Sequence, residues 1–176
     1  MVWSELIQVH KKVQNEFRKF LRNNGGNLGK VCYLGSLNLN GTIEYMDKVG
    51  FDIIEGPGVD VVIAPGIIPM DHKLKYDTCV SISSFQFCPD PEIYMSEILD
   101  LLRNTAGSKL FLTLCHESCK TSHTTSDNRY SFKDEIRFSE EKLIDFFSSE
   151  FEIIVKKTSR SILSNHRDYV ITGILK

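Results

Sequence analysis

The first residues of the chain carry apolar side chains at helical spacing. Over residues 4–22 these side chains recur every three or four positions, with basic residues mostly on the opposite face, which predicts an amphipathic helix. The run Asn23-Asn24-Gly25-Gly26 then supplies residues that end helices. Such an apolar stripe needs a surface to pack on. Its members are Trp3, Leu6, Ile7, Val13, Phe17, Phe20 and Leu21.

After this helix, short apolar runs alternate with amphipathic segments. This alternation is typical of an α/β protein with a mostly parallel, doubly wound sheet. The runs predict strands near 30–34, 49–53, 59–63, 78–83, 109–115, 151–158 and 168–175, and helices over 42–47, 91–103 and 139–149.

One connection does not fit this pattern easily. Only Glu55-Gly56-Pro57-Gly58 and their neighbours separate the second predicted strand from the third. A parallel crossover usually needs about a dozen residues or more. Taken alone, the segment therefore favours an antiparallel hairpin.

Length, composition and charge restrict the class of protein. A chain of 176 residues, of which 41% are hydrophobic and 25% charged, suits a single domain spanning residues 1–176 with its own core. The net charge of −2 and the lack of a long basic run argue against tight nucleic-acid binding. We expect no membrane partner, because no apolar run approaches the roughly 20 residues that span a bilayer. Oligomeric state cannot be read.

The cysteines and the first residues indicate the compartment. Five cysteines, an odd number, together with Met1–Glu5, which show no signal-peptide pattern, argue against a disulfide framework. We therefore expect a reducing, cytoplasmic location. Cys32 and Cys79 fall inside predicted strands and are expected in the core.

Three predicted strands end in residues suited to a ligand. The first runs into Leu34-Gly35-Ser36, where a glycine lets a ligand approach the backbone. The second ends on Asp52, whose carboxylate is placed to accept two ribose hydroxyls. A later buried strand ends in Ser83-Ser84. Together these strand ends are typical of a nucleoside-binding α/β domain.

The order of these motifs resembles the class I S-adenosylmethionine-dependent methyltransferases. The family's GS-x-x-x-NG variant corresponds to Gly35-Ser36 with Asn40-Gly41, and its strand ending in G-x-D to Gly50-Phe51-Asp52. Tyr76-Asp77, Ser83-Ser84 and Asp90-Pro91 follow in the family's order. The resemblance covers residues 30 to 176. It implies a Rossmann-like sheet with a terminal antiparallel hairpin strand, and a short parallel connection in place of the hairpin at Glu55–Gly58.

The resemblance also implies a cofactor, S-adenosylmethionine, and residues that hold it. Gly35, Ser36 and Asn40 would lie in the cofactor loop, and Asp52 would bind the ribose, with Glu55 as the substitute if the register is shifted. Ile53 would face the adenine, and Ser83 and Ser84 would lie beside the sulfonium. Each of these residues could instead have a purely structural role, in a turn, as a helix cap or in the core.

Departures from the family leave activity open. Many members carry an acid where Tyr33 and Ala64 stand, and a Glu-His pair where this chain has Gln86-Phe87. The leading hypothesis is methyl transfer to an unidentified small-molecule acceptor. The alternative is a non-catalytic S-adenosylmethionine-binding or scaffold domain. A nicotinamide-dependent oxidoreductase is disfavoured, since no G-x-G-x-x-G opens a helix.

The segment after the fifth strand carries the remaining candidate chemistry. His116 is the candidate catalytic residue, as a general base or as a group that orients the acceptor. Cys115, His116, Cys119 and His123 could in principle bind zinc, but adjacent strand residues point in opposite directions, so we expect no metal site. The hydrophilic run 116–135 is long enough for a lid. We expect residues 1–24 and this lid to cover the cofactor cleft.

Overall fold

A computed structural model describes residues 3–37, 47–88, 90–117, 138–158 and 167–176, with only the backbone described for residues 3–10. Within these ranges, no helix has both the length and the apolar composition that crossing a bilayer requires.

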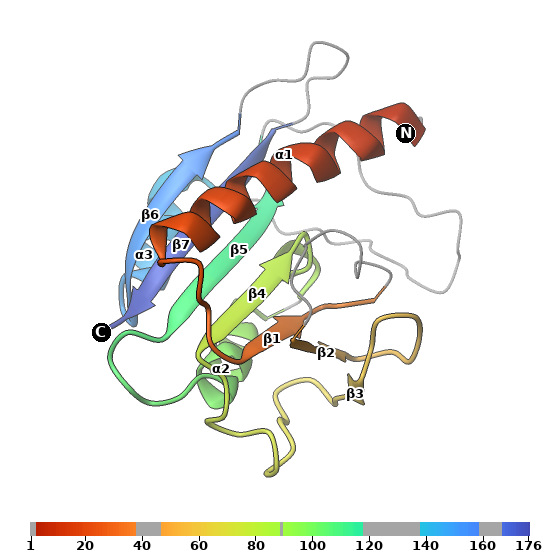
Figure 1. Cartoon of the computed structure of the whole chain (residues 1–176), viewed down its shortest axis with the longest axis vertical. Helices are drawn as coiled ribbons and strands as arrows, with labels where there is room; N and C mark the ends of the chain where they lie inside the picture. Colours follow the sequence, from red (N-terminus) through yellow and green to blue (C-terminus); the bar gives the residue numbers. More distant parts are fainter. Residues whose placement is uncertain (1–2, 38–46, 89, 118–137, 159–166) are drawn as a thin grey trace.

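The fold is built on one mixed sheet with the strand order β3-β2-β1-β4-β5-β7-β6 (Figure 1). β1, β2, β3, β4 and β5 are parallel to one another, whereas β7 runs antiparallel to both of its neighbours, β5 and β6. The predicted doubly wound, mostly parallel sheet with a terminal antiparallel hairpin is therefore confirmed. The strands are β1 (Val31–Leu34), β2 (Lys48–Asp52), β3 (Val61–Val62), β4 (Thr78–Ile82), β5 (Lys109–Cys115), β6 (Phe151–Lys157) and β7 (Asp168–Leu175).

Helices cover both faces of the sheet. In Figure 1, α1 (Trp3–Asn23) crosses one face in front of β5 and β7, while α2 (Pro91–Leu101) and α3 (Glu140–Phe147) lie behind it. A short 3₁₀ helix, η1 (Phe85–Phe87), follows β4. Side chains along β1 alternate between the two faces of the sheet. Val31 and Tyr33 pack in the core under α1, and Cys32 and Leu34 pack in the core under α2 and α3.

The described part of the α1 stripe is core. Val13, Phe17 and Phe20 are buried, and the ring of Phe111 in β5 lies 5.1 Å from that of Phe17 and 5.4 Å from that of Phe20. These helix side chains therefore pack on the face of the sheet. Whether the first turns of α1 also cover the cleft depends on side chains outside the described residues.

The short connection between β2 and β3 is parallel, which confirms what the family resemblance implied, and the hairpin that Glu55–Gly58 favours when taken alone does not form. The register explains how so short a connection suffices. β3 pairs only with the end of β2, with Phe51 opposite Val61 and Asp52 opposite Val62. The chain therefore returns past two residues rather than along a whole strand, and residues 53–60 span that distance without a helix.

The other predicted elements are found within a few residues of their expected bounds. The largest difference is β3, which was predicted over 59–63 and forms only at Val61–Val62. The helix predicted over 42–47 falls almost wholly outside the described residues. Cys32 and Cys79 are fully buried, as expected for core residues.

Candidate functional site

The strand order reverses between β1 and β4, which are neighbours in the middle of the sheet. In open α/β sheets, ligands bind outside the carboxyl ends of the strands at such a switch point. The strand ends singled out by the sequence, Gly35, Asp52 and Ser83-Ser84, all lie at this edge.

Hydrogen bonds join the ends of β1 and β4 across the switch point. Gly35 has a φ of +74°, in the left-handed region that favours glycine. The Ser84 hydroxyl donates to the Gly35 carbonyl oxygen at 3.0 Å. A methyl group added at Gly35 would lie 2.1 Å from that hydroxyl oxygen, so only glycine allows Ser84 to approach.

The ends of β1 and β2 are also joined. The backbone N–H groups of Gly35 and Ser36 both donate to the carbonyl oxygen of Phe51, at 2.8 and 3.1 Å. The Ser36 side chain is fully buried, and within the described part of the chain its hydroxyl has no hydrogen-bond partner. An unsatisfied buried hydroxyl costs about 1–3 kcal/mol, so this position is destabilising unless a residue outside the described ranges bonds it.

Asp52 is half-buried at the tip of β2. One carboxylate oxygen accepts the Leu37 N–H at 3.1 Å and the other accepts the Ile54 N–H at 3.3 Å. Burial raises the pKa of this carboxyl, and the bonds from the backbone N–H groups of Leu37, Ile54 and Ile53 oppose that rise. Because each carboxylate oxygen has more than one lone pair, Asp52 retains acceptor capacity for a ligand while it holds the Gly35–Leu37 turn.

The β2–β3 connection folds back against this turn. The Asp60 carboxylate accepts the Gly50 N–H at 2.7 Å, and the Asp60 N–H donates to the Gly50 carbonyl oxygen at 2.8 Å. A methyl group added at Gly50 would lie 2.1 Å from the Gly58 carbonyl oxygen. Glycine at 50 therefore lets the connection pack closely, and Asp60 holds it there.

Ser83 has an unusual backbone conformation for a residue other than glycine. Its φ is +54°, and its N–H donates to the Thr113 carbonyl oxygen of β5 at 2.8 Å. Such conformations cost about 1–3 kcal/mol and cluster at ligand sites. Beneath the switch point, the Tyr94 hydroxyl of α2 lies 2.8 Å from the Ser81 hydroxyl and donates to the Leu34 carbonyl oxygen at 3.4 Å.

The proposed adenine side is formed by exposed residues next to β2 and β3. Ile53 is 54% exposed, so its side chain is available to an apolar ligand group. Ala64 and Ile67 close a tight turn after β3, with the Ile67 N–H donating to the Ala64 carbonyl oxygen at 2.9 Å. The buried carboxylate of Glu97 in α2 accepts the Gly66 N–H of this turn at 2.7 Å. Burial raises the pKa of Glu97, and the Gly66 N–H opposes that rise.

His116 lies at the carboxyl end of β5, apart from the hydrogen-bonded cluster of Gly35, Asp52 and Ser84. Its side chain is buried and its ring stacks on Tyr169 of β7, with 4.6 Å between ring centroids. Its backbone N–H donates to the Arg167 carbonyl oxygen at 3.0 Å. Described hydrogen bonds therefore bring together the ends of three strands at Gly35, Asp52 and Ser84, whereas the described contacts of His116 are with β7 and Arg167.

Two predicted features extend beyond the described residues. Asn40 of the cofactor loop lies outside them, as does the lid from Ser118 onward. Cys119 and His123, two of the four candidate zinc ligands, are also outside, and the described His, Cys, Asp and Glu side chains form no cluster that could hold a metal ion.

Sequence reasoning missed several residues that hold the site together. Asp60 had a weak signal, as an acid within the apolar run Val59–Ile63. Gln86 was noted only as a departure from the family, yet its buried amide oxygen accepts the Cys115 N–H at 2.7 Å and links η1 to β5. Tyr94 and Glu97 reach their partners from α2, and nothing local in the sequence indicates those contacts.

Comparison with solved structures identifies the fold. A methyltransferase from Thermotoga maritima that depends on S-adenosylmethionine matches with a TM-score of 0.64 at 17% identity, covering 99% of this chain and 95% of that one. The 1,6-didemethyltoxoflavin-N1-methyltransferase of Burkholderia thailandensis, which contains 1,6-didemethyltoxoflavin and S-adenosylhomocysteine, matches with a TM-score of 0.67 at 13% identity, covering 93% and 78%.

The chain has the fold of the class I methyltransferases. A third match, an S-adenosylmethionine-dependent methyltransferase from Aquifex aeolicus, has a TM-score of 0.60 at 10% identity and covers 90% of this chain and 89% of that one. No protein-family model matches the sequence, and no curated protein does. The likeness is therefore one of fold, and function has to be argued from the site.

Proposed function

We propose that this chain binds S-adenosylmethionine at the carboxyl edge of β1, β2 and β4 and transfers its methyl group to a small-molecule acceptor. The observation that carries the proposal is the cluster at the switch point, where Gly35, Asp52 and Ser84 from three strands are held together by hydrogen bonds. Solved structures of the same fold are methyltransferases that depend on this cofactor.

The chemistry of the site suits the parts of the cofactor. Asp52 would accept the ribose hydroxyls with its remaining lone pairs, since charge-assisted bonds of this kind are strong. Ile53 would cover one face of the adenine. The turn at Gly35-Ser36 would receive the methionine part.

When bound, the cofactor supplies an electrophilic methyl group on its sulfonium. The chain's own part is then to align an acceptor with that methyl group and to exclude water, which can provide much of the rate enhancement. Ser83 and Ser84 lie at the end of β4, where they would border the transfer site. His116, at the end of β5, would take a proton from the acceptor or hold its orientation.

A small acceptor fits the available observations better than a macromolecule. The Burkholderia enzyme holds a small heterocyclic compound together with S-adenosylhomocysteine. The present chain has a net charge of −2, which does not favour the phosphate backbone of a nucleic acid.

The test is a screen of small hydroxyl, amine, thiol and carboxyl compounds for release of S-adenosylhomocysteine. Wild-type protein should turn over at least one of them. His116→Ala should then slow turnover by roughly 10²–10⁴-fold if the imidazole is a general base. The control is the affinity of each protein for S-adenosylhomocysteine, which His116→Ala should leave nearly intact. Equal rates for His116→Ala and wild type would remove the histidine from the mechanism.

The second candidate is a non-catalytic domain of the same fold. It is favoured by the exposed Ala64 and the buried Tyr33, which stand where many methyltransferases carry acids. Tight binding of S-adenosylhomocysteine without turnover of any compound would support this candidate.

A further inference from the structure

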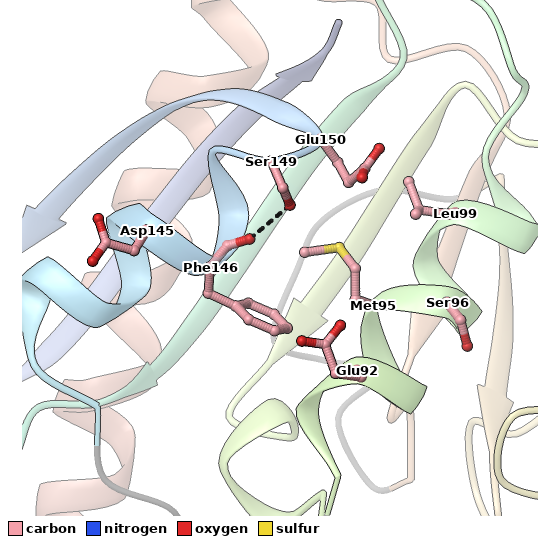
Figure 2. Close-up of a pocket in the computed structure, with 8 residues that line it drawn as sticks. All are labelled: Glu92, Met95, Ser96, Leu99, Asp145, Phe146, Ser149 and Glu150. Carbon is pink, nitrogen blue, oxygen red and sulfur yellow. Dashed lines mark hydrogen bonds between the residues drawn. The ribbon is translucent and has the colours of Figure 1, made fainter.

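A groove on the opposite side of the molecule from α1 is not used by the proposed function. It lies between α2 and α3, with a volume of about 340 Å³ (Figure 2). Its lining side chains come from α2 and from the end of α3 with the turn that follows it. The site at the carboxyl ends of β1, β2 and β4 contributes none of them.

The floor of the groove is apolar. In Figure 2 the ring of Phe146 and the thioether of Met95 point toward one another across the space between the two helices, and Leu99 continues the floor. Met95 is buried, whereas Phe146 and Leu99 are only partly covered. A partner with apolar side chains could therefore bury surface here.

The rim of the groove is acidic. Glu92, Asp145 and Glu150 border it, and none of these carboxylates forms an ion pair with any residue that the structure describes. In Figure 2 the Glu92 carboxylate lies beside the Phe146 ring. Carboxylates beside an apolar floor attract cations with long aliphatic stems.

The two serines of the rim reinforce this preference. The Ser96 hydroxyl donates to the Ile93 carbonyl oxygen at 2.7 Å, and the Ser149 hydroxyl donates to the Phe146 carbonyl oxygen at 3.0 Å. Since each hydroxyl has a single hydrogen, both serines can only accept further bonds. The polar side chains of the rim are therefore all acceptors, and a donor-rich cation such as arginine complements them.

The groove is elongated, which favours a segment of protein over a compact ligand. A second hollow of about 290 Å³ adjoins the first and shares Leu99, Ser149 and Glu150 with it. Its lining adds two leucines, Leu74 and Leu175, and Leu74 is 51% exposed. Of the charged residues that only this hollow contains, Asp100 pairs with Lys73 at 2.7 Å and Lys176 is itself a cation, so this hollow is less acidic than the first. The first hollow therefore complements positively charged side chains of a ligand, and the second complements apolar ones.

We propose that this α2–α3 groove docks a segment of a partner protein that carries arginine or lysine residues at one end and leucine-like residues at the other. The basic side chains occupy the hollow between Glu92 and Glu150, and the apolar ones cover Leu99 and Leu74. This docking does not depend on methyl transfer, since the groove and the cofactor edge share no residue.

The test uses a blocked, fluorescently labelled peptide with arginines at one end and leucines at the other, with a glutamate-leucine peptide of the same layout and spermine as comparison ligands. In amide NMR spectra the basic peptide should shift residues 92–99 and 145–150, and the acidic peptide should shift neither. Shifts spread over all surface acids, or shifts confined to the ends of β1, β2 and β4, would overturn the proposal. Equal affinity for spermine and the peptide would also overturn it, because the groove would then be a small-cation site.

Matched variants sharpen the result. Replacing Glu92, Asp145 and Glu150 by their amides should weaken binding of the basic peptide roughly tenfold, as expected for a few partly exposed ion pairs. The control replaces Asp71, Glu141 and Glu152, which are also exposed acids. It changes net charge equally but should leave affinity within roughly twofold, because these residues do not line the groove. Equal loss in both variants would mean that only net charge matters. Concentration-dependent self-association that blocks the peptide would show that a second copy occupies the groove instead.

Discussion

The two ends of the sheet are built differently. The β5-β7-β6 end has strands of 7, 8 and 7 residues, and α1 and α3 pack against it. The β1-β2-β3 end has strands of 4, 5 and 2 residues, and its connections are held by carboxylate-to-backbone bonds at Asp52 and Asp60.

This difference separates stability from ligand binding. Long strands with aromatic layers bury much apolar surface, so they contribute most of the favourable free energy of folding. Short strands leave the turns at their carboxyl ends accessible, and these turns carry the backbone groups and the carboxylate that a nucleoside needs. Substitutions at the first end should therefore affect unfolding, and substitutions at the second should affect binding.

The largest effect is expected at Phe111, which packs between Phe17 and Phe20. Phe111→Ala should lower the free energy of unfolding by about 3–5 kcal/mol, because it removes a buried ring and leaves a cavity. Val62→Ala in β3 should cost less than about 0.5 kcal/mol, since that side chain is 53% exposed. Urea unfolding followed by circular dichroism measures both. Similar losses for the two variants would contradict the division between the ends.

The next effect is expected at Gly35. This residue lies at the ligand-binding end of the sheet, yet its substitution should lower the free energy of unfolding, because its backbone conformation favours glycine. Gly35→Ala should cost about 2–4 kcal/mol, from its positive φ and from the collision with Ser84. Gly25 also has a positive φ but has no atom within 4 Å of an added methyl group, so Gly25→Ala should cost only about 1–2 kcal/mol.

A double-mutant cycle isolates the collision. Adding Ser84→Gly to Gly35→Ala should recover part of the loss, whereas adding it to Gly25→Ala should not. Independent effects in both pairs, measured by urea unfolding, would mean that Ser84 does not restrict position 35.

The third effect is measured as a change in ligand binding. Asp52→Ala should lower the affinity for S-adenosylhomocysteine by about 1.5–3 kcal/mol, the value of hydrogen bonds to a charged group. Glu55→Gln tests the alternative register and should leave affinity unchanged, because Glu55 is exposed and makes no bond to the turn in the described structure. Calorimetric titration of both folded variants decides between them. A loss at Glu55 with none at Asp52 would transfer the ribose contact to Glu55.

The smallest effect is a pH dependence at Glu97. Burial raises the pKa of this carboxyl in the folded protein above its usual value, so the folded state binds the proton more tightly than the unfolded chain does. Stability therefore falls as pH rises from the unfolded pKa, near 4.5, through the folded pKa. Glu97→Gln keeps an acceptor for the Gly66 N–H but does not titrate, so it should gain stability relative to wild type as pH rises. Urea unfolding between pH 4 and 7 measures the difference, and a difference that shrinks with rising pH would contradict the assignment.

Much of the fold could be predicted from the sequence, because the spacing of apolar residues and the length of apolar runs depend only on neighbouring residues. The helical spacing of Val13, Phe17 and Phe20 indicated α1, and the apolar run at Lys109–Cys115 indicated β5 with its observed bounds. The β2–β3 connection could not be predicted from loop length. A connection between parallel strands usually runs back along a whole strand. Only the register shows that this connection runs back along two residues of β2.

The residues of the candidate site also fall into two groups, those with a local signal in the sequence and those without one. Gly35 and Asp52 carry a local signal, since one ends a strand with a glycine and the other ends a strand with an acid. Asp60, Gln86 and Glu97 act through side-chain bonds to backbone groups 10, 29 and 31 residues away. No periodic pattern marks such bonds, because the partner is a backbone group that every residue possesses.

The central claim is that S-adenosylmethionine binds at the ends of β1, β2 and β4, and S-adenosylhomocysteine tests it without an acceptor. Calorimetric titration of the folded wild-type chain should give a saturable heat, and amide NMR spectra of the same sample should shift at Gly35, Asp52 and Ser84 while the α2–α3 groove stays unchanged. No heat at millimolar ligand with the protein folded, or shifts that avoid these three strand ends, would contradict the account.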